Sequence, residues 1–191
     1  MKLLIVDLDG TLVNTCEVNY FAYSEALNKY GISFEMQYFR NNCNGKSYKD
    51  FLPPILIKGG IPENNLSNVM DTVHRIKKDV YFKYINKALL NQHLLNIIRA
   101  LKTSYRISLV TTASKDNCRQ LLEYFDITDL FDFVVSREDV IENKPSPEGF
   151  VKAMAHYGVR PNDTVIFEDS EEGKKAALQV TSNVYITYGY R

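Results

Sequence analysis

Side chains that could do chemistry occur in four short segments, each placed directly after or just beyond an apolar run. Several of them are carboxylates, and gathering carboxylates in one crevice is costly unless a cation neutralises them. Carboxylate oxygens together with retained waters are the ligands that Mg²⁺ prefers in proteins. The four segments contain Asp7 and Asp9, residues 111–114, Lys144, and Glu168 with Asp169.

Taken together, these residue types describe a site for a phosphoryl group. Asp7 and Asp169 could hold a hard cation, and a carboxylate of the Asp7–Asp9 pair then remains for nucleophilic attack or proton transfer. Lys144 adds a permanent positive charge, and Thr112 with backbone N–H groups at the start of a helix adds donors for an anion. This combination suits phosphoryl transfer through an aspartyl phosphate.

These four segments would meet if the chain folds into a parallel sheet, whose strands end at a common edge where ligands bind. Residues 3–6 are a continuous apolar run, which is typical of a strand buried on both faces. Later strands alternate with helical stretches through short connections, so we predict an α/β fold with a Rossmann-like parallel sheet. The later strands are predicted at residues 105–111, 131–135, 164–167 and 183–187.

Between the first and second predicted strands lies a block, residues 14–87, in which every predicted element is helical. Ser47 should cap a short helix that Pro53 and Pro54 end or kink, and a long helix should run over residues 62–87. The sequence therefore predicts a sheet domain with an inserted all-helical domain. The expected α/β core comprises residues 1–13 and 88–191, and the expected helical cap comprises residues 14–87.

Composition and charge exclude several classes of protein. The 191 residues include 23 lysines and arginines against 23 aspartates and glutamates, whereas a protein that neutralises nucleic-acid phosphates normally has a basic excess. No apolar run is long enough to span a bilayer. Cys16, Cys43 and Cys118 lie far apart and match neither a disulfide framework nor a zinc site. We expect a cytoplasmic protein without a nucleic-acid or membrane partner.

Four motifs in this chain resemble, in order and in position, those of the haloacid dehalogenase superfamily. They are Asp-Leu-Asp-Gly-Thr after the first strand, Leu-Val-Thr-Thr-Ala-Ser, Asn-Lys-Pro-Ser-Pro, and the run IFEDSEEGKKAA. The resemblance covers residues 1–180, and the helical insertion is similar to the cap of the subgroup that includes phosphoglycolate phosphatases and β-phosphoglucomutase. It implies a Mg²⁺-dependent phosphatase that hydrolyses a small phosphorylated metabolite through an aspartyl phosphate.

The resemblance also implies roles for the residues of the core. Asp7 is the nucleophile, and Asp9 is the general acid and base whose backbone carbonyl also binds the metal. Asp169 is the remaining metal ligand, and Glu168 binds the metal directly or through water. Structural roles are the alternative, since Glu168 and Asp169 could complement a helix dipole and Ser114 could cap a helix. The phosphoryl group is bound by Thr112, Lys144, the amides of Leu8, Asp9 and Ala113, and the Ser114 hydroxyl.

By the same resemblance, the cap selects the substrate. Thr15 lies at the hinge, Gly45 lies in a loop that faces the active site, and Lys77 faces it from the last long cap helix. The charges around Lys77 also fit a solvated helix face. Tyr48 stands where phosphomutases of the family hold an arginine for a second phosphate, and Lys46 or Lys49 could take the place of that arginine. A sugar phosphomutase and a catalytically silent binding or regulatory protein are the alternatives, and the retained Asp9 argues against the silent one.

Overall fold

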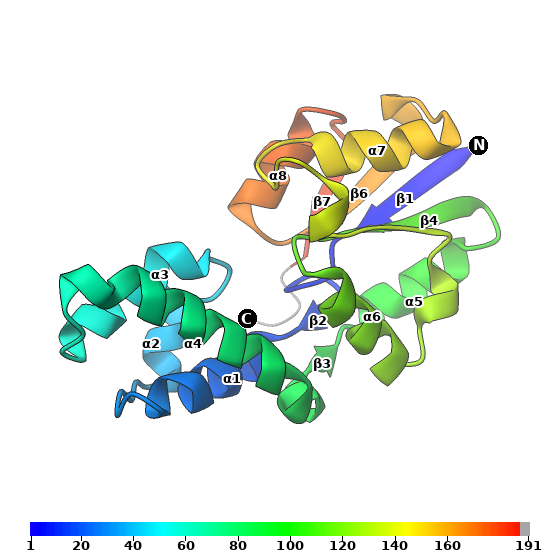
Figure 1. Cartoon of the computed structure of the whole chain (residues 1–191). Helices are drawn as coiled ribbons and strands as arrows, with labels where there is room; N and C mark the ends of the chain where they lie inside the picture. Colours follow the sequence, from blue (N-terminus) through cyan, green and yellow to red (C-terminus); the bar gives the residue numbers. More distant parts are fainter. Residues whose placement is uncertain (188–191) are drawn as a thin grey trace. The chain divides into compact units, whose positions relative to one another are not determined.

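The computed structural model describes residues 1–187 and divides into two compact units, whose elements are labelled in Figure 1. The first unit contains Met1–Asn14 together with the described residues from Leu89 onward. The second unit contains Thr15–Ala88 and is built from helices. Each unit has its own hydrophobic core.

Within the described residues, a five-stranded sheet of order β5-β4-β1-β6-β7 forms the centre of the first unit. Every neighbouring pair in it is parallel, which confirms the predicted α/β fold. The central strand β1 (Lys2–Val6) is fully buried over residues 3–6, which explains its uninterrupted apolar run. The other strands are β4 (Tyr105–Val110), β5 (Phe133–Val135), β6 (Thr164–Glu168) and β7 (Val184–Ile186).

Helices cover both faces of this sheet, with α7 and α8 on one side and α5 and α6 on the other (Figure 1). Polar caps fix where they begin: Ser114 accepts the Asn117 N–H (3.3 Å), and Ser170 accepts the Gly173 N–H (3.0 Å). The helices are α5 (Gln92–Leu101), α6 (Lys115–Tyr124), α7 (Glu148–Tyr157) and α8 (Glu171–Leu178). Short 3₁₀ turns occupy Thr128–Leu130, Arg137–Asp139 and Pro161–Asp163.

A short antiparallel ribbon joins the points where the chain leaves and re-enters the first unit. It pairs β2 (Val13–Asn14) with β3 (Leu89–Leu90). Asn91 holds the ribbon in place, because its backbone N–H donates to the Leu12 carbonyl (2.8 Å) and its side chain donates to the Thr11 carbonyl (3.1 Å). The sequence analysis did not predict this ribbon, since two-residue strands leave no periodic pattern.

The helical unit differs from the prediction at two places. The helix that Ser47 caps continues through Pro53 and Pro54, because its buried residues on both sides of the prolines pack into the core of the unit. The predicted long helix over residues 62–87 is divided, with regular α-helix only at its centre. The elements are α1 (Cys16–Asn28), α2 (Met36–Asn42), α3 (Tyr48–Lys58), α4 (Leu66–Val80) and 3₁₀ turns at Glu63–Asn65 and Tyr81–Lys87.

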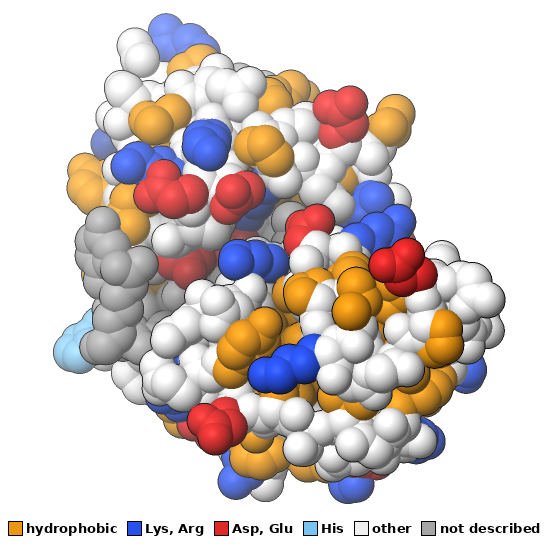
Figure 2. Space-filling view, turned by 90° about the vertical axis from the view of Figure 1, so that its left-hand side faces the viewer, with side chains coloured by type: hydrophobic (Ala, Val, Ile, Leu, Met, Phe, Trp, Pro, Cys, Tyr) orange, Lys and Arg blue, Asp and Glu red, His pale blue; other side chains and the backbone are white. Residues whose placement is uncertain are grey.

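The face of the molecule drawn in Figure 2 carries basic, acidic and hydrophobic side chains in mixed order. On that face, the described residues form no continuous basic surface, in keeping with a formal net charge of zero. Among residues 1–187, no helix combines the length and the apolar character that crossing a membrane requires.

His74 lies in an aromatic stack in the helical unit. Its ring lies flat on that of Tyr48, with centroids 3.8 Å apart and 6° between the planes, and its Nδ1 is 3.0 Å from the Tyr23 hydroxyl. Burial, together with the positive charges of Lys77 and Lys78, lowers the pKa of His74 to about 4. The folded unit therefore holds this imidazole neutral.

Acid should for this reason destabilise the folded chain through His74. The unfolded chain takes up the proton near pH 6.5 and the folded chain only near pH 4, so stability falls as pH falls between these values. We expect His74→Asn to reduce the pH dependence of the thermal unfolding midpoint, followed by circular dichroism, over this range. His93→Asn, at an exposed position, is the matched control. Equal pH dependence in both variants would contradict this assignment.

Candidate active site

Carboxylates from two neighbouring strands meet at the carboxyl edge of the sheet. Asp7 directly follows β1, and Glu168 ends β6 with Asp169 immediately after it. Because β1 and β6 are paired in parallel, their ends lie side by side. One ligand oxygen from each of the three side chains lies within 4.8 Å of the others. This oxygen set fits a hard divalent cation such as Mg²⁺.

Lys144 places a positive charge among these carboxylates. Its Nζ donates to Asp7 Oδ1 (2.6 Å) and to the Val110 carbonyl (3.1 Å), and it forms an ion pair with Glu168 Oε1. The Lys144 side chain is 8% exposed, and the Glu168 side chain is fully buried. Burial by itself lowers the pKa of Lys144, but Asp7 and Glu168 outweigh it and hold that pKa above its usual value. The ammonium group is therefore charged.

The carboxylates nevertheless outnumber the one ammonium group among them. Burial raises the pKa of Asp7 well above its usual value, and Glu168 and Asp169 raise it further against the opposing effect of Lys144. Burial also raises the pKa of Asp169 to about 6, with Glu168 adding to the shift and a hydrogen bond from Thr11 opposing it. A positive charge added to the cluster would lower the pKa values of both Asp7 and Asp169. The charges of the cluster, as well as its donor atoms, therefore fit a bound divalent cation.

The loop after β1 closes against Asp169. Gly10 has a φ of 93°, and a Cβ at this position would overlap the Asp169 carboxylate. The Thr11 hydroxyl donates to Asp169 Oδ1 (3.0 Å). Asp9 lies on the same loop, partly buried, where it forms an isolated β-bridge with Val13. The Asp-Leu-Asp-Gly-Thr motif thus places a glycine and a hydroxyl against the carboxylate that follows β6.

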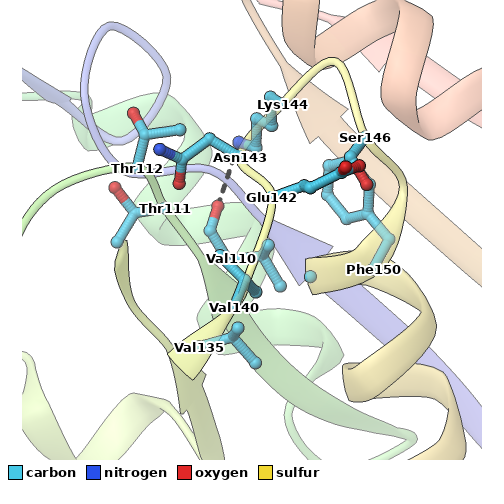
Figure 3. Close-up of a pocket in the computed structure, with 11 residues that line it drawn as sticks. Val110, Thr111, Thr112, Val135, Val140, Glu142, Asn143, Lys144, Ser146 and Phe150 are labelled. Atoms are coloured by element: carbon cyan, nitrogen blue, oxygen red, sulfur yellow. Dashed lines mark hydrogen bonds between the residues drawn. The ribbon is translucent and has the colours of Figure 1, made fainter. Parts of the chain in front are cut away.

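Lys144 also borders a pocket with Thr111, Thr112 and Asn143 (Figure 3). Thr112 is exposed, whereas the buried Thr111 hydroxyl accepts a hydrogen bond from the Ala113 N–H (3.0 Å). Asn143 extends toward both threonines, and its Oδ1 is buried without a hydrogen-bond partner in the described part of the chain. The sequence analysis assigned Asn143 no role, because a pocket-lining amide and a loop amide look alike in sequence.

The predicted cap residues all lie in the helical unit. Thr15 is the N-cap of α1, and its hydroxyl accepts a hydrogen bond from Asn19 Nδ2 (3.2 Å). Gly45 has a φ of 78° in the turn before α3. Lys77 is only 7% exposed, and its Nζ lies over two tyrosine rings, 4.5 Å from the centroid of Tyr81. This burial excludes the alternative that Lys77 lies on a solvated helix face.

Comparison with known proteins gives matches along nearly the whole chain. A family model described as haloacid dehalogenase-like hydrolase matches residues 4–186. Over 180 residues the chain is 30% identical to the beta-phosphoglucomutase of Bacillus subtilis, covering 92% of this chain and 78% of that protein. Over 177 residues it is 27% identical to the phosphorylated carbohydrates phosphatase of Thermotoga maritima, covering 93% and 80%.

The fold is also similar to that of a solved structure. The crystal structure of CbbY from Rhodobacter sphaeroides in complex with phosphate matches with a TM-score of 0.79 and 24% sequence identity, covering all of this chain and 88% of that one. The match to the family model confirms the resemblance seen in the four motifs.

Proposed function

Since the chain belongs to the haloacid dehalogenase-like hydrolase family, we propose that it is a phosphatase that hydrolyses a small phosphorylated metabolite. The observation that carries this proposal is the contact of Lys144 with Asp7, at 2.6 Å, within a cluster that also contains Glu168 and Asp169. A reactive carboxylate, a charged lysine and a set of oxygen ligands are the groups that phosphoryl transfer requires.

In the proposed reaction, Asp7 is the nucleophile. Its carboxylate oxygen bonds to phosphorus while the bond from phosphorus to the ester oxygen breaks, which gives an aspartyl phosphate and an alcohol. Asp9 donates the proton that the leaving oxygen needs and then accepts one from the attacking water. The water oxygen bonds to phosphorus, inorganic phosphate leaves, and the Asp7 carboxylate is restored.

The other residues of the edge hold the reacting groups. Asp7, Asp169 and the backbone carbonyl of Asp9 would hold Mg²⁺, with Glu168 beside them. When bound, Mg²⁺ neutralises charge on the phosphoryl oxygens and on the carboxylates. Lys144 would bind the phosphoryl oxygens, helped by the N-terminus of α6. Thr112 and the Ala113 N–H complete the phosphoryl site, the latter exchanging its bond to Thr111 Oγ1 for one to the substrate.

We propose further that residues 14–87 act as a cap domain that selects the substrate, through Thr15, Gly45 and Lys77, and that residues 1–13 and 88–191 form the catalytic core. A buried ammonium group, held over tyrosine rings, can discriminate between leaving groups through a hydrogen bond or an ion pair.

Lys77→Ala should therefore change substrate preference more than it changes the chemistry. We expect KM for the best phosphorylated metabolite to rise about tenfold, because a hydrogen bond from a charged group is lost. Cleavage of p-nitrophenyl phosphate, which lacks the natural leaving group, should stay near the unaltered rate. Lys78→Ala, at the exposed neighbouring position, is the matched control. An equal loss on both substrates would make Lys77 a structural residue.

A sugar phosphomutase is the second candidate, because the B. subtilis relative is named as one. Tyr48 argues against it, since this position carries an arginine for the second phosphate in the mutases that the motifs resemble. Here the Tyr48 hydroxyl donates to Asp71 Oδ1 (3.2 Å) and its ring is stacked on His74. A phenol beside a carboxylate offers a second phosphate no positive charge.

A phosphate-release assay over a panel of phosphorylated metabolites with Mg²⁺ tests the proposed function. We expect free phosphate from at least one small phosphorylated sugar or acid, without any need for a bisphosphate activator. Isomerisation of a sugar phosphate that depends on a bisphosphate would show a mutase. Binding without turnover would show the catalytically silent alternative.

A further inference from the structure

The Glu168 carboxylate links Lys144 to the start of helix α8. Its Oε1 forms the ion pair with Lys144. Its Oε2 accepts hydrogen bonds from the Asp169 N–H (2.9 Å), the Ser170 N–H (3.1 Å) and the Ser170 hydroxyl (3.1 Å). The three donors at the start of α8 occupy the lone-pair sites of Oε2, and Lys144 occupies one of the two sites of Oε1. A metal ion that bound Glu168 directly would have to share Oε1 with the lysine.

Gly173 lies in the first turn of α8, directly against this carboxylate. A Cβ at position 173 would overlap the Glu168 carboxylate carbon and both of its oxygens. Glycine makes a helix less stable than alanine does. The close approach of the Glu168 carboxylate, which leaves no room for a Cβ, explains why a glycine is found here. The Gly173 N–H also donates to Ser170 Oγ (3.0 Å), which in turn donates to Glu168. This glycine is part of the fourth motif, yet the proposed reaction gives it no task.

We propose that Glu168 and Gly173 are positioning residues for Lys144 and that Glu168 is not a metal ligand. The buried carboxylate fixes the ammonium group beside Asp7, and the missing side chain at Gly173 lets α8 close on that carboxylate. The inference rests on the proposed function, in which Lys144 binds the phosphoryl group. Displacing the carboxylate should therefore weaken phosphate binding and leave the binding of a divalent cation nearly unchanged.

Gly173→Ala tests this separation, because it moves the carboxylate without changing any charge. Inorganic phosphate serves as one probe and Mn²⁺ alone serves as the other, and the binding of each is measured by calorimetry. We expect the phosphate constant to rise about tenfold, as a small misplacement of a binding group can cause, and the Mn²⁺ dissociation constant to stay within about threefold.

The matched control is Gly158→Ala, at a position with φ of 61° and open space around an added Cβ. This variant should lose stability and keep both binding constants. An equal rise of the Mn²⁺ and phosphate constants in Gly173→Ala would make Glu168 a metal ligand. An unchanged phosphate constant would show that the close approach of α8 does not position Lys144. Either result overturns the proposal.

A double-mutant cycle covers the case in which Gly173→Ala does not fold. In the Glu168→Ala background the carboxylate is gone and the added methyl group at position 173 has room. Glu168→Ala and the double variant should therefore bind phosphate equally, which is the signature of direct coupling. A further tenfold loss of phosphate affinity in the double variant would contradict the proposal. Because these readouts need no turnover, a chain that shows them but releases no phosphate would refute the proposed function alone.

Discussion

Asp7→Asn should abolish phosphate release and leave the fold intact. An amide cannot form the aspartyl phosphate, so we expect kcat on the best substrate to fall at least about 10³-fold, the scale on which removal of a nucleophile acts. Phosphate release measures the first expectation, and the thermal unfolding midpoint in EDTA measures the second. Near-normal turnover would refute the assignment of Asp7 as the nucleophile.

The fold should survive because the charge on Asp7 is unfavourable where it lies. Burial and the neighbouring carboxylates raise the pKa of Asp7, so the folded chain loses stability as pH rises through that pKa. A neutral amide of the same shape avoids this loss, and Lys144 keeps Glu168 as its partner. We therefore expect an unfolding midpoint in EDTA at neutral pH no lower than that of the unaltered chain. Asp116→Asn, at an exposed position on α6, is the matched control and should keep full turnover.

Chelation with EDTA should stop turnover, and Mg²⁺ should restore it. Without a cation, a phosphoryl dianion would meet several carboxylates and one ammonium group, and we expect the rate to fall at least about a hundredfold. Phosphate release with and without added Mg²⁺ measures this effect. Turnover that is unchanged by EDTA would contradict the proposed role of a metal ion in the reaction.

Substitution of single carboxylates tests where the cation binds. Asp169→Asn should raise the Mg²⁺ concentration needed for half-maximal activity, whereas Glu171→Gln, an exposed carboxylate two residues later, should not. Mg²⁺ should also raise the unfolding midpoint of the unaltered chain more above pH 6 than below it. The pKa of Asp169 is raised to about 6, so protons compete with the cation at lower pH. An equal Mg²⁺ requirement in both variants would place the cation elsewhere.

The parallel sheet and the convergence at its edge could be predicted because they depend on simple patterns. A continuous apolar run such as residues 3–6 is typical of a strand buried on both faces, which is how these residues lie. Parallel strands end at one edge, so a polar residue after each strand is brought to the same place. Asp7, after β1, and Asp169, after β6, lie in one cluster for this reason although they are far apart in sequence.

Features that depend on tertiary packing could not be predicted. The helix that passes through Pro53 and Pro54 is held by buried neighbours on either side, which overrides the local preference of proline. The burial of Lys77 depends on tyrosines from two separate elements. For Glu168, the sequence suggests metal ligation, with a helix-dipole interaction as the alternative, and only the atomic contacts with Lys144 and the start of α8 favour a positioning role.

The central claim is that Asp7 carries the phosphoryl group during turnover. Rapid quenching of the chain with substrate and Mg²⁺, followed by borohydride reduction, converts an aspartyl phosphate into homoserine, which peptide mass spectrometry can locate. We predict homoserine at position 7 that disappears when EDTA replaces Mg²⁺. Phosphate release without any reduced residue at position 7, or with the label on another carboxylate, would contradict the proposed reaction.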